Sequence, residues 1–211
     1  KEIKPAPHLI GKGSIAIVPD IMLRGYDPIT VFFPSNRGPA NGGPLDRPGG
    51  LLRLSPSHPG EYKWLDARTL QFLPTIPWPA LERFTVNADG KTFSLVTLMA
   101  PPRKISPKSN STGLDPIKKI NVSFKAPIDP GQLSAMITFD VRPLPGISGE
   151  KSYRLTSRDF AIKELERKSH THDARYLVTF HKPIPNGKRV ILNLRLSADA
   201  KIEGSLVRYT F

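Results

Sequence analysis

The sequence predicts an all-β protein made of two tandem immunoglobulin-like antiparallel β-sandwich domains. Its 211 residues include 23 Pro and 16 Gly, and Pro disfavours long helices because it lacks a backbone donor and clashes with the preceding turn. Short apolar runs alternate with polar residues along the chain, which is typical of strands with one buried face. Two motifs recur in the same order in both halves, which indicates a duplicated unit.

In the first half, apolar runs separated by turn residues predict a series of short strands. Ile29, Val31 and Phe33 alternate with Thr30 and Phe32 and should share one strongly apolar face. The segment Asn36–Gly50 is rich in Gly and Pro and predicts a long exposed loop. The pair Asp89-Gly90 suits a tight hairpin turn. We expect strands at residues 29–33, 51–54, 62–64, 69–73, 82–86 and 92–98.

The second half repeats this pattern after a break in apolar periodicity. Ala100–Gly113 holds three Pro and four Ser or Thr and predicts a linker, which gives domains at residues 1–100, with an N-terminal extension, and 101–211. Ile128–Ser134 predicts a turn that can start a short helix. Residues 160–165 fit a strand or a helix, and a strand is preferred. The other expected strands are at residues 120–124, 135–141, 175–180, 188–196 and 206–211.

The internal repeat consists of two matched pairs of segments. Ile29–Phe33 (ITVFF) matches Ile120–Phe124 (INVSF), and Pro77–Phe84 (PWPALERF) aligns without a gap to Pro183–Val190 (PIPNGKRV). The members of each pair lie about 100 residues apart, the size of an immunoglobulin-like domain. In each Pro-x-Pro segment, Pro should stiffen an exposed corner between two strands.

The two tryptophans have different expected places. Trp64 alternates with Tyr62, which predicts a core or half-buried strand position. Trp78 lies between two prolines, where it is either an exposed contact residue or a cap over one end of the sandwich. The candidate partner-contact residues are Trp78, Arg83, Arg37 and Arg47.

The chain is strongly basic, with a formal net charge of +13. Such an excess can attract nucleic acid, anionic lipid or acidic proteins. The basic residues do not cluster along the sequence, so the alternatives are a functional basic patch and a charged surface that only confers solubility. The chain has no Cys, which excludes a thiol nucleophile, a Cys-based zinc site and an internal thioester within it.

No catalytic, cofactor-binding or metal-binding residue is predicted. The sequence HTHD, His170–Asp173, resembles the start of a metal-ligand string, but no second histidine cluster accompanies it, and a polar loop is the preferred interpretation. Carboxylates at Asp159 and Glu164 lie among basic residues, which favours a solvated, paired surface over acid–base chemistry. No run of about 20 apolar residues or signal peptide is present, so the start resembles a mature or trimmed terminus.

Most of the chain resembles the N-terminal part of bacterial alpha-2-macroglobulin family proteins. The most specific segment is Tyr62–Val86, YKWLDARTLQFLPTIPWPALERFTV. Gly113–Pro130 resembles the opening strand of the next immunoglobulin-like or macroglobulin-like domain. The other segments that carry the resemblance are Met22–Phe33, Thr97–Pro102, Val141–Gly146 and Lys182–Leu196.

The resemblance implies a periplasmic or lipid-anchored protein, of which this chain would be an N-terminal piece. In that family, macroglobulin domains frame a bait region whose cleavage makes the whole molecule close around the peptidase. Some members add a thioester built from Cys and Gln, and others, of the MagD-like type, lack it. Neither a thioester motif nor a bait region is recognisable here, so no active residue is carried over.

Two functions follow as expectations. The first is a non-enzymatic, cofactor-free pair of structural and interaction domains in a broad-spectrum peptidase trap. Its partners would be other domains of the same chain, peptidases through the full-length protein and other periplasmic proteins, with no nucleic acid and with membrane contact only through an anchor outside this chain. The alternative is a cell-envelope module that binds an anionic polysaccharide, lipopolysaccharide or nucleic acid, which requires a contiguous basic face with interleaved aromatics.

Overall fold

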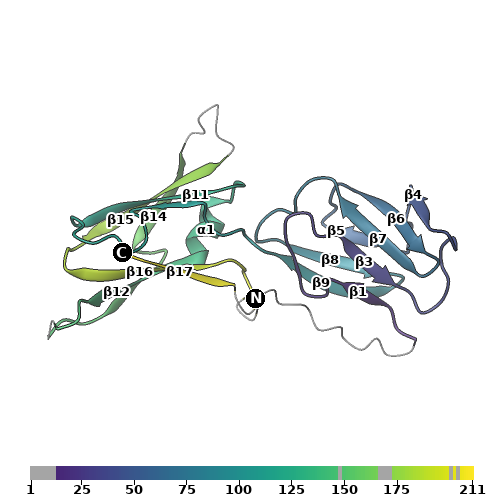
Figure 1. The fold of residues 1–211 in the computed structure, drawn as a ribbon, viewed down its shortest axis with the longest axis horizontal. Helices are drawn as coiled ribbons and strands as arrows, with labels where there is room; N and C mark the ends of the chain where they lie inside the picture. The colour runs from purple at the N-terminus through teal and green to yellow at the C-terminus, as the bar shows by residue number, and fades with distance from the viewer. Residues whose placement is uncertain (1–12, 147–148, 166–172, 200–201, 203–204) are drawn as a thin grey trace. The chain divides into compact units, whose positions relative to one another are not determined.

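The chain folds into two compact units, residues 1–98 and 99–211, which we call the first and second domains. The computed structural model describes residues 13–146, 149–165, 173–199, 202 and 205–211. Each domain is a sandwich of two β-sheets, and the described residues include one short helix (Figure 1). The prediction of an all-β fold with two sandwich domains is therefore confirmed.

The first domain pairs a five-stranded sheet with a four-stranded one. The order of the first sheet is β1-β3-β7-β6-β4, formed by Ala16–Val18, Ile29–Phe32, Thr69–Pro74, Gly60–Asp66 and Gly43–Leu45. The order of the second is β2-β9-β8-β5, formed by Met22–Leu23, Lys91–Thr97, Arg83–Ala88 and Arg53–Ser55. All neighbours are antiparallel except β2 and β9, which run parallel.

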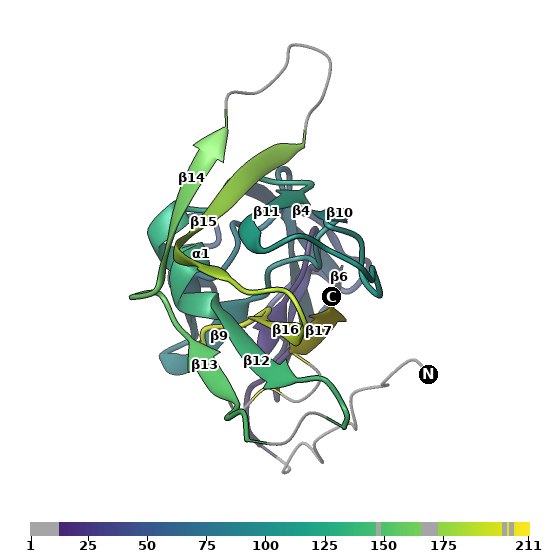
Figure 2. The same cartoon turned by 90° about the vertical axis from the view of Figure 1, so that its left-hand side faces the viewer.

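The second domain has two four-stranded antiparallel sheets. The order of one is β10-β11-β15-β14, formed by Lys104–Ser106, Ile117–Phe124, Ala174–Ile184 and Phe160–Leu165. The order of the other is β13-β12-β16-β17, formed by Tyr153–Leu155, Ile137–Pro143, Lys188–Arg195 and Leu206–Thr210. Figure 2 shows the two layers, with helix α1 (Pro130–Met136) in the connection from β11 to β12.

Both domains have the immunoglobulin-like strand order. In this fold, strands A, B, E and D form one sheet and strands C, F and G form the other. In the first domain strands A to G are β1, β3, β5, β6, β7, β8 and β9, and in the second they are β10, β11, β12, β14, β15, β16 and β17. The matches ITVFF and INVSF lie on the two B strands, and the Pro-x-Pro segments precede the two F strands.

Alternating burial accounts for both cores. Ile29, Val31 and Phe33 are at most 4% exposed, as their alternation predicts. The hairpin turn between β8 and β9 is also confirmed: Asp89 and Gly90 have φ values of 47° and 84°, and tight hairpins favour such positive angles. Residues 160–165 form a strand, and α1 begins at Pro130 behind the cap provided by Asp129, whose side chain accepts from the Gln132 amide at 2.9 Å.

Two segments expected to lack regular structure contain strands. Ala100–Gly113 is not a free linker, because β10 lies within it and pairs with β11. Asn36–Gly50 is not wholly a loop, because β4 pairs with the edge of β6. Each is a three-residue edge strand, and so short a strand has too few alternating positions to show a periodic signal.

A buried tyrosine fixes the connection between the two sheets of the second domain. The Tyr176 ring is fully buried and packs against Phe124, with ring centroids 5.8 Å apart. Its hydroxyl donates to the carbonyl of Ile128 and accepts from the amide of the same residue, both at 2.7 Å. One hydroxyl thus pairs both polar backbone groups of a residue that is itself buried just before α1.

We predict that Tyr176→Phe lowers the free energy of unfolding of the second domain by about 1 to 3 kcal/mol, because it leaves a buried N–H and C=O without their partner. Both tryptophans lie in the first domain, so tryptophan fluorescence would not report on unfolding of the second. Amide hydrogen exchange of β15 and β16 is therefore the appropriate measurement. Tyr153→Phe, at a 42% exposed ring in the same domain, is the control. Equal exchange in both variants would contradict the role of this hydroxyl.

Candidate functional site

The outer surface of one sheet of the second domain carries five arginines. Strands β12, β13, β16 and β17 place on it Arg142, Arg154, Arg189, Arg195 and Arg208. Asp140 is the one carboxylate among the outward positions of these strands. We call this surface the arginine face.

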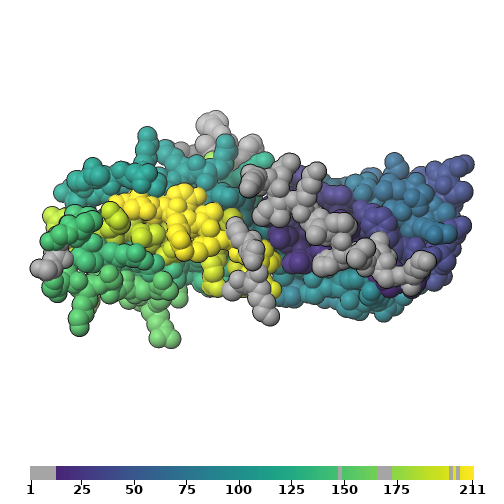
Figure 3. Space-filling model, turned by 60° about the horizontal axis from the view of Figure 1, so that its bottom comes forward, coloured from purple at the N-terminus to yellow at the C-terminus, as the bar shows by residue number. Residues whose placement is uncertain are grey.

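Alternation along the strands puts these side chains on one side. Successive strand residues point to opposite faces, and Phe139, Val141, Val190, Leu192 and Leu194 are all at most 1% exposed. Burial of these residues in the sandwich core forces their neighbours in sequence to point outward. In the space-filling view, the yellow segment that includes β17 lies at the surface of this domain (Figure 3).

The strand pairing brings charges of the same sign together. Arg142 of β12 lies directly opposite Arg189 of β16. Like charges at paired positions destabilise a sheet, so this arrangement is not explained by the stability of the fold. Pairing also aligns Arg154 with Asp140, and Arg208 with Asn193. With strands about 4.8 Å apart and alternate residues about 6.8 Å apart, the face extends about 20 Å along the strands and about 15 Å across them.

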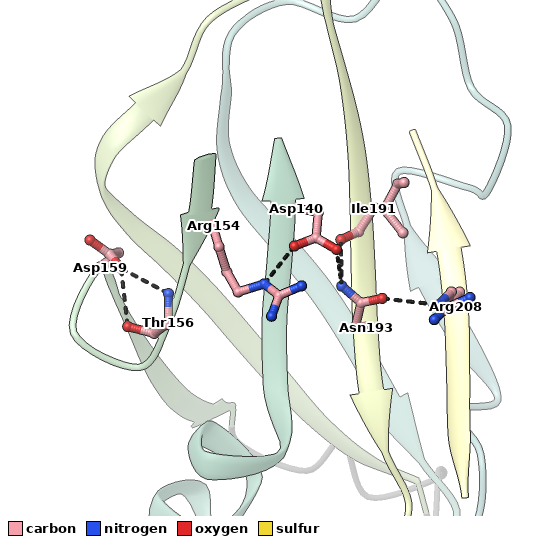
Figure 4. A network of polar contacts seen from close by, with 7 residues as sticks. All are labelled: Asp140, Arg154, Thr156, Asp159, Ile191, Asn193 and Arg208. Carbon is pink, nitrogen blue, oxygen red and sulfur yellow. Dashed lines mark hydrogen bonds and ion pairs between the residues drawn. The ribbon is translucent and has the colours of Figure 1, made fainter. Parts of the chain in front are cut away.

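Asp140 holds part of the face in place through a row of hydrogen bonds (Figure 4). Its carboxylate accepts from Arg154 Nε at 2.6 Å and from Asn193 Nδ2 at 3.0 Å. The Asn193 Oδ1 atom in turn accepts from Arg208 Nε at 3.3 Å. The hydrogen bond from Arg154 lowers the pKa of Asp140, partial burial opposes this effect, and the Asn193 amide adds to the lowering.

The equivalent surface of the first domain is much less basic. Matching the C, F and G strands by their pairing places Ser55 at the position of Asp140, Thr92 at that of Arg208 and Asp89 at that of Arg195. Arg83 and Arg189 occupy the same position, the fourth residue after the second proline of each Pro-x-Pro segment. Since the first domain forms the same sheet with small polar residues, the fold does not require the other arginines.

The division of charge between the domains agrees with this contrast. Residues 1–98 contain 11 Lys and Arg against 8 Asp and Glu, whereas residues 99–211 contain 20 against 10. The formal net charge of +13 is therefore +3 in the first domain and +10 in the second. The excess of positive charge therefore lies mainly in the second domain.

Trp78 is not an exposed contact residue, and this part of the expectation is wrong. It is 6% exposed, and its Nε1 donates to the Asp27 carbonyl at 2.8 Å. Its ring packs against Phe84 and Phe72, so the alternative of a cap on the sandwich holds. Trp64 is 3% exposed on strand β6, so of the two predicted places, core or half-buried, the core is the one observed.

The other candidate contact residues do not form a cluster. Arg37 makes an ion pair with Asp89 at the turn that follows β8. Arg83 is exposed at the opposite end of β8, where its Nη1 donates to Ser94 Oγ at 2.8 Å. Arg47 is exposed on the turn after β4. The structure thus does not assemble Trp78, Arg83, Arg37 and Arg47 into one site.

The metal interpretation of His170 and His172 falls on residues outside those that the structure describes. Within the described ranges, no group of three or more His, Asp and Glu side chains is placed to hold a metal ion. In the same part of the chain, no helix is long and apolar enough to cross a membrane.

The arginine face is not among the predicted sites, although part of its signal is present in the sequence. In Lys188–Leu196, Arg189 and Arg195 are six residues apart and share one strand face, and Arg142 follows an alternating run. What the sequence lacks is the pairing of β12 with β16 and of β16 with β17, which turns scattered arginines into neighbours.

Comparison with known proteins gives only distant likenesses. No protein-family model matches the chain, and no curated protein does. Among solved structures, L,D-transpeptidase 3 from Mycobacterium tuberculosis in complex with a faropenem-derived adduct is 16% identical, with a TM-score of 0.30 over 67% of this chain and 72% of that chain. An L,D-transpeptidase from Mycobacterium smegmatis is 17% identical, with a TM-score of 0.32 over 70% and 72%. Domains 5–6 of the S-layer protein SbsC are 10% identical, with a TM-score of 0.19 over 93% and 95%.

We predict that Asp140→Asn lowers the free energy of unfolding of the second domain at pH 7 by about 0.5 to 1 kcal/mol, a small value because Arg154 is largely exposed to solvent. The folded-state pKa of Asp140 is lowered, so its contribution is present above the unfolded-state pKa of about 3.9 and is lost as the pH falls through the folded-state value. The difference between wild type and variant should therefore shrink toward zero in acid.

The measurement is urea unfolding, followed by NMR signals of the second domain, at pH 7, 5 and 3. Asp115→Asn removes the same charge at an exposed position of that domain and is the matched control. A deficit in Asp140→Asn that stays constant over this range would refute the link between its ionisation and stability.

Proposed function

We propose that this chain is a non-enzymatic interaction module of the bacterial cell envelope, and that its second domain binds an anionic polysaccharide through the arginine face. The observation that carries the proposal is that five arginines and a single carboxylate share one sheet surface. A face of this kind raises the local concentration of polyanions and pairs with them directly.

The choice of arginine supports oxyanions as the recognised groups. The arginine face has no Lys among its outward strand positions, whereas the outer surface of the other sheet of this domain carries Lys104, Lys119 and Lys163 beside Arg175. The guanidinium group presents donors in a planar fork that matches carboxylate, phosphate and sulfate, whereas an ammonium group acts as a point charge.

The layout of the face supports a linear ligand with repeated charges. The arginines are spread over about 20 Å, which is several times the width of one oxyanion. None of the outward residues on these four strands is aromatic, so the interleaved aromatics expected of such a face are absent, and bases of a single-stranded nucleic acid would find no ring to stack on. A charged polysaccharide needs no such ring for its carboxylate or sulfate groups.

We predict that the double substitution Arg142→Ser/Arg189→Ser weakens binding of heparin, alginate or polyphosphate by about tenfold at low salt, if each exposed arginine contributes about 0.5 to 1 kcal/mol. Isothermal titration calorimetry with the three polymers separates sulfate, carboxylate and phosphate as the preferred group. The slope of log K against log salt is negative, and its magnitude should decrease by about two because two ionic contacts are lost.

The first domain supplies a matched control. Arg53→Ser/Arg83→Ser removes two exposed arginines from the equivalent sheet, where they are separated along the strands. This control should bind within about twofold of wild type. An equal loss in both double variants would reduce the effect to net charge, and tighter binding of single-stranded DNA than of any polysaccharide would contradict the ligand class.

A second candidate function is that of structural and interaction domains in an alpha-2-macroglobulin-like peptidase trap of the periplasm. Its support is the resemblance of Tyr62–Val86, which forms β6, β7 and the start of β8 around the buried Trp64 and Trp78. Such a rigid unit suits a domain that braces its neighbours while a bait region elsewhere is cleaved.

For that candidate, we predict that this chain alone does not inhibit peptidases, because trapping requires bait cleavage and rearrangement of the whole molecule. The assay measures hydrolysis of a large protein substrate with this chain and, separately, with the full-length protein. Stoichiometric inhibition by this chain would argue for direct binding to the peptidase active site and against a trap.

A further inference from the structure

Equivalent positions at one end of the two sandwiches can be matched residue by residue. In the first domain, Ile29 of strand B pairs with Phe72 of strand E, and in the second domain Ile120 of strand B pairs with Val178 of strand E. Since Ile29 and Ile120 are equivalent in the repeat, Phe72 and Val178 are equivalent too. The hydrogen bond from the Thr75 amide to the Pro59 carbonyl, 3.1 Å, then corresponds to that from the His181 amide to the Asp159 carbonyl, 2.9 Å.

This matching makes His58 the counterpart of Arg158, and Trp78 the counterpart of Ile184. The gapless alignment of the two Pro-x-Pro segments gives the second equivalence independently. The two ends of the domains therefore differ in which side chains occupy a shared place.

In the first domain, an aromatic stack fills this place. The rings of His58 and Trp78 lie with centroids 4.3 Å apart at 20°, and Phe84 meets the indole edge-on at 4.9 Å. The His58 ring also makes a 3.1 Å hydrogen bond to the Ile76 carbonyl. An indole supplied by the chain itself thus closes the end of the first sandwich.

In the second domain, the same place is an open groove of about 510 Å³. Ile184 is smaller than an indole and is buried, while Arg158 is exposed and stacks on no ring in the part of the chain that the structure describes. The volume lies within the range of small-ligand sites, about 300 to 1,000 Å³. The lining residues are Tyr153, Leu155, Arg158, Asp159, His181, Lys182, Pro183 and Ile184.

The groove combines apolar surface with exposed cations. Tyr153 has a 42% exposed ring, and Leu155 is half-buried beside it. Arg158 and Lys182 are exposed on the rim. The Asp159 carboxylate turns toward its own chain, where one oxygen accepts from the Thr156 amide at 2.8 Å and from its hydroxyl at 3.2 Å (Figure 4).

We propose that this groove binds an aromatic side chain from an acidic segment of a partner protein. The ring would take the place that Trp78 fills in the first domain, where it would contact Tyr153 and lie beneath the Arg158 guanidinium, which favours aromatic faces. Carboxylates flanking the ring would pair with Arg158 and Lys182. The proposal is independent of the arginine face, because none of the five arginines of that face lines the groove.

The test uses the whole chain labelled with ¹⁵N and two peptides, Ac-EEWEE-NH₂ and Ac-EEAEE-NH₂. The Trp peptide should cause saturable amide shifts at the groove, chiefly at Leu155, Arg158, His181 and Ile184. The Ala peptide should bind at least about fivefold more weakly, since burial of a large aromatic ring contributes more than 1 kcal/mol.

Two variants and one control place the binding site. Arg158→Ser, at an exposed residue, should lower the affinity for the Trp peptide by about three- to fivefold. Ile184→Trp restores the indole of the first domain and should abolish the shifts. Arg142→Ser/Arg189→Ser leaves the groove intact and should bind within about twofold of wild type.

Several results would overturn the proposal: equal affinity for both peptides, shifts confined to the arginine face or the first domain, or an unchanged affinity in Arg158→Ser. If Ile184→Trp fails to fold, Arg158→Ser together with the peptide pair decides the question. Loss of polysaccharide binding in Arg142→Ser/Arg189→Ser with intact peptide binding would separate this site from the proposed function.

Discussion

Burial of the inward side chains of β12 and β16 is the constraint on which the surface of the second domain depends. Phe139, Val141, Val190 and Leu192 are almost fully buried, and a slip of one residue in either strand would turn them toward water. Burial of each such side chain contributes about 1.5 to 3 kcal/mol, which far exceeds the repulsion between two exposed guanidinium groups. The core can therefore hold Arg142 opposite Arg189, an arrangement that local electrostatics alone would not favour.

The two domains show how one strand order can support different surfaces. Inward positions of matched strands keep apolar residues in both, for example Leu54 and Phe139, or Val86 and Leu192. Outward positions and sandwich ends differ freely, because they carry little of the burial that stabilises the fold. An indole closes the end of the first domain, whereas the second domain leaves the equivalent place open and surrounds it with cations.

Asp140 is the carboxylate that orders part of the arginine face. It offsets part of the positive charge, and through Asn193 it also fixes the orientation of Arg208, so one carboxylate orders two guanidinium groups on different strands. No ion pair joins Arg142 or Arg189 to a carboxylate among the described residues, although the charge of Arg142 helps to lower the pKa of Asp140. The face thus combines arginines that hydrogen bonds hold in place with arginines whose charge no ion pair offsets.

The sequence by itself determined the fold class, most strands, the Asp89-Gly90 hairpin and the strand position of Trp64, because alternation and turn chemistry are local properties. It also placed the repeat on strands that prove equivalent. It could not place the edge strands β1, β2, β4, β10 and β13, whose two or three residues gain their structure from pairing. Only the tertiary structure decided that Trp78 is buried and that five arginines meet on one sheet. Both depend on contacts between residues far apart in the chain, since cross-strand pairing and not sequence spacing sets which side chains become neighbours.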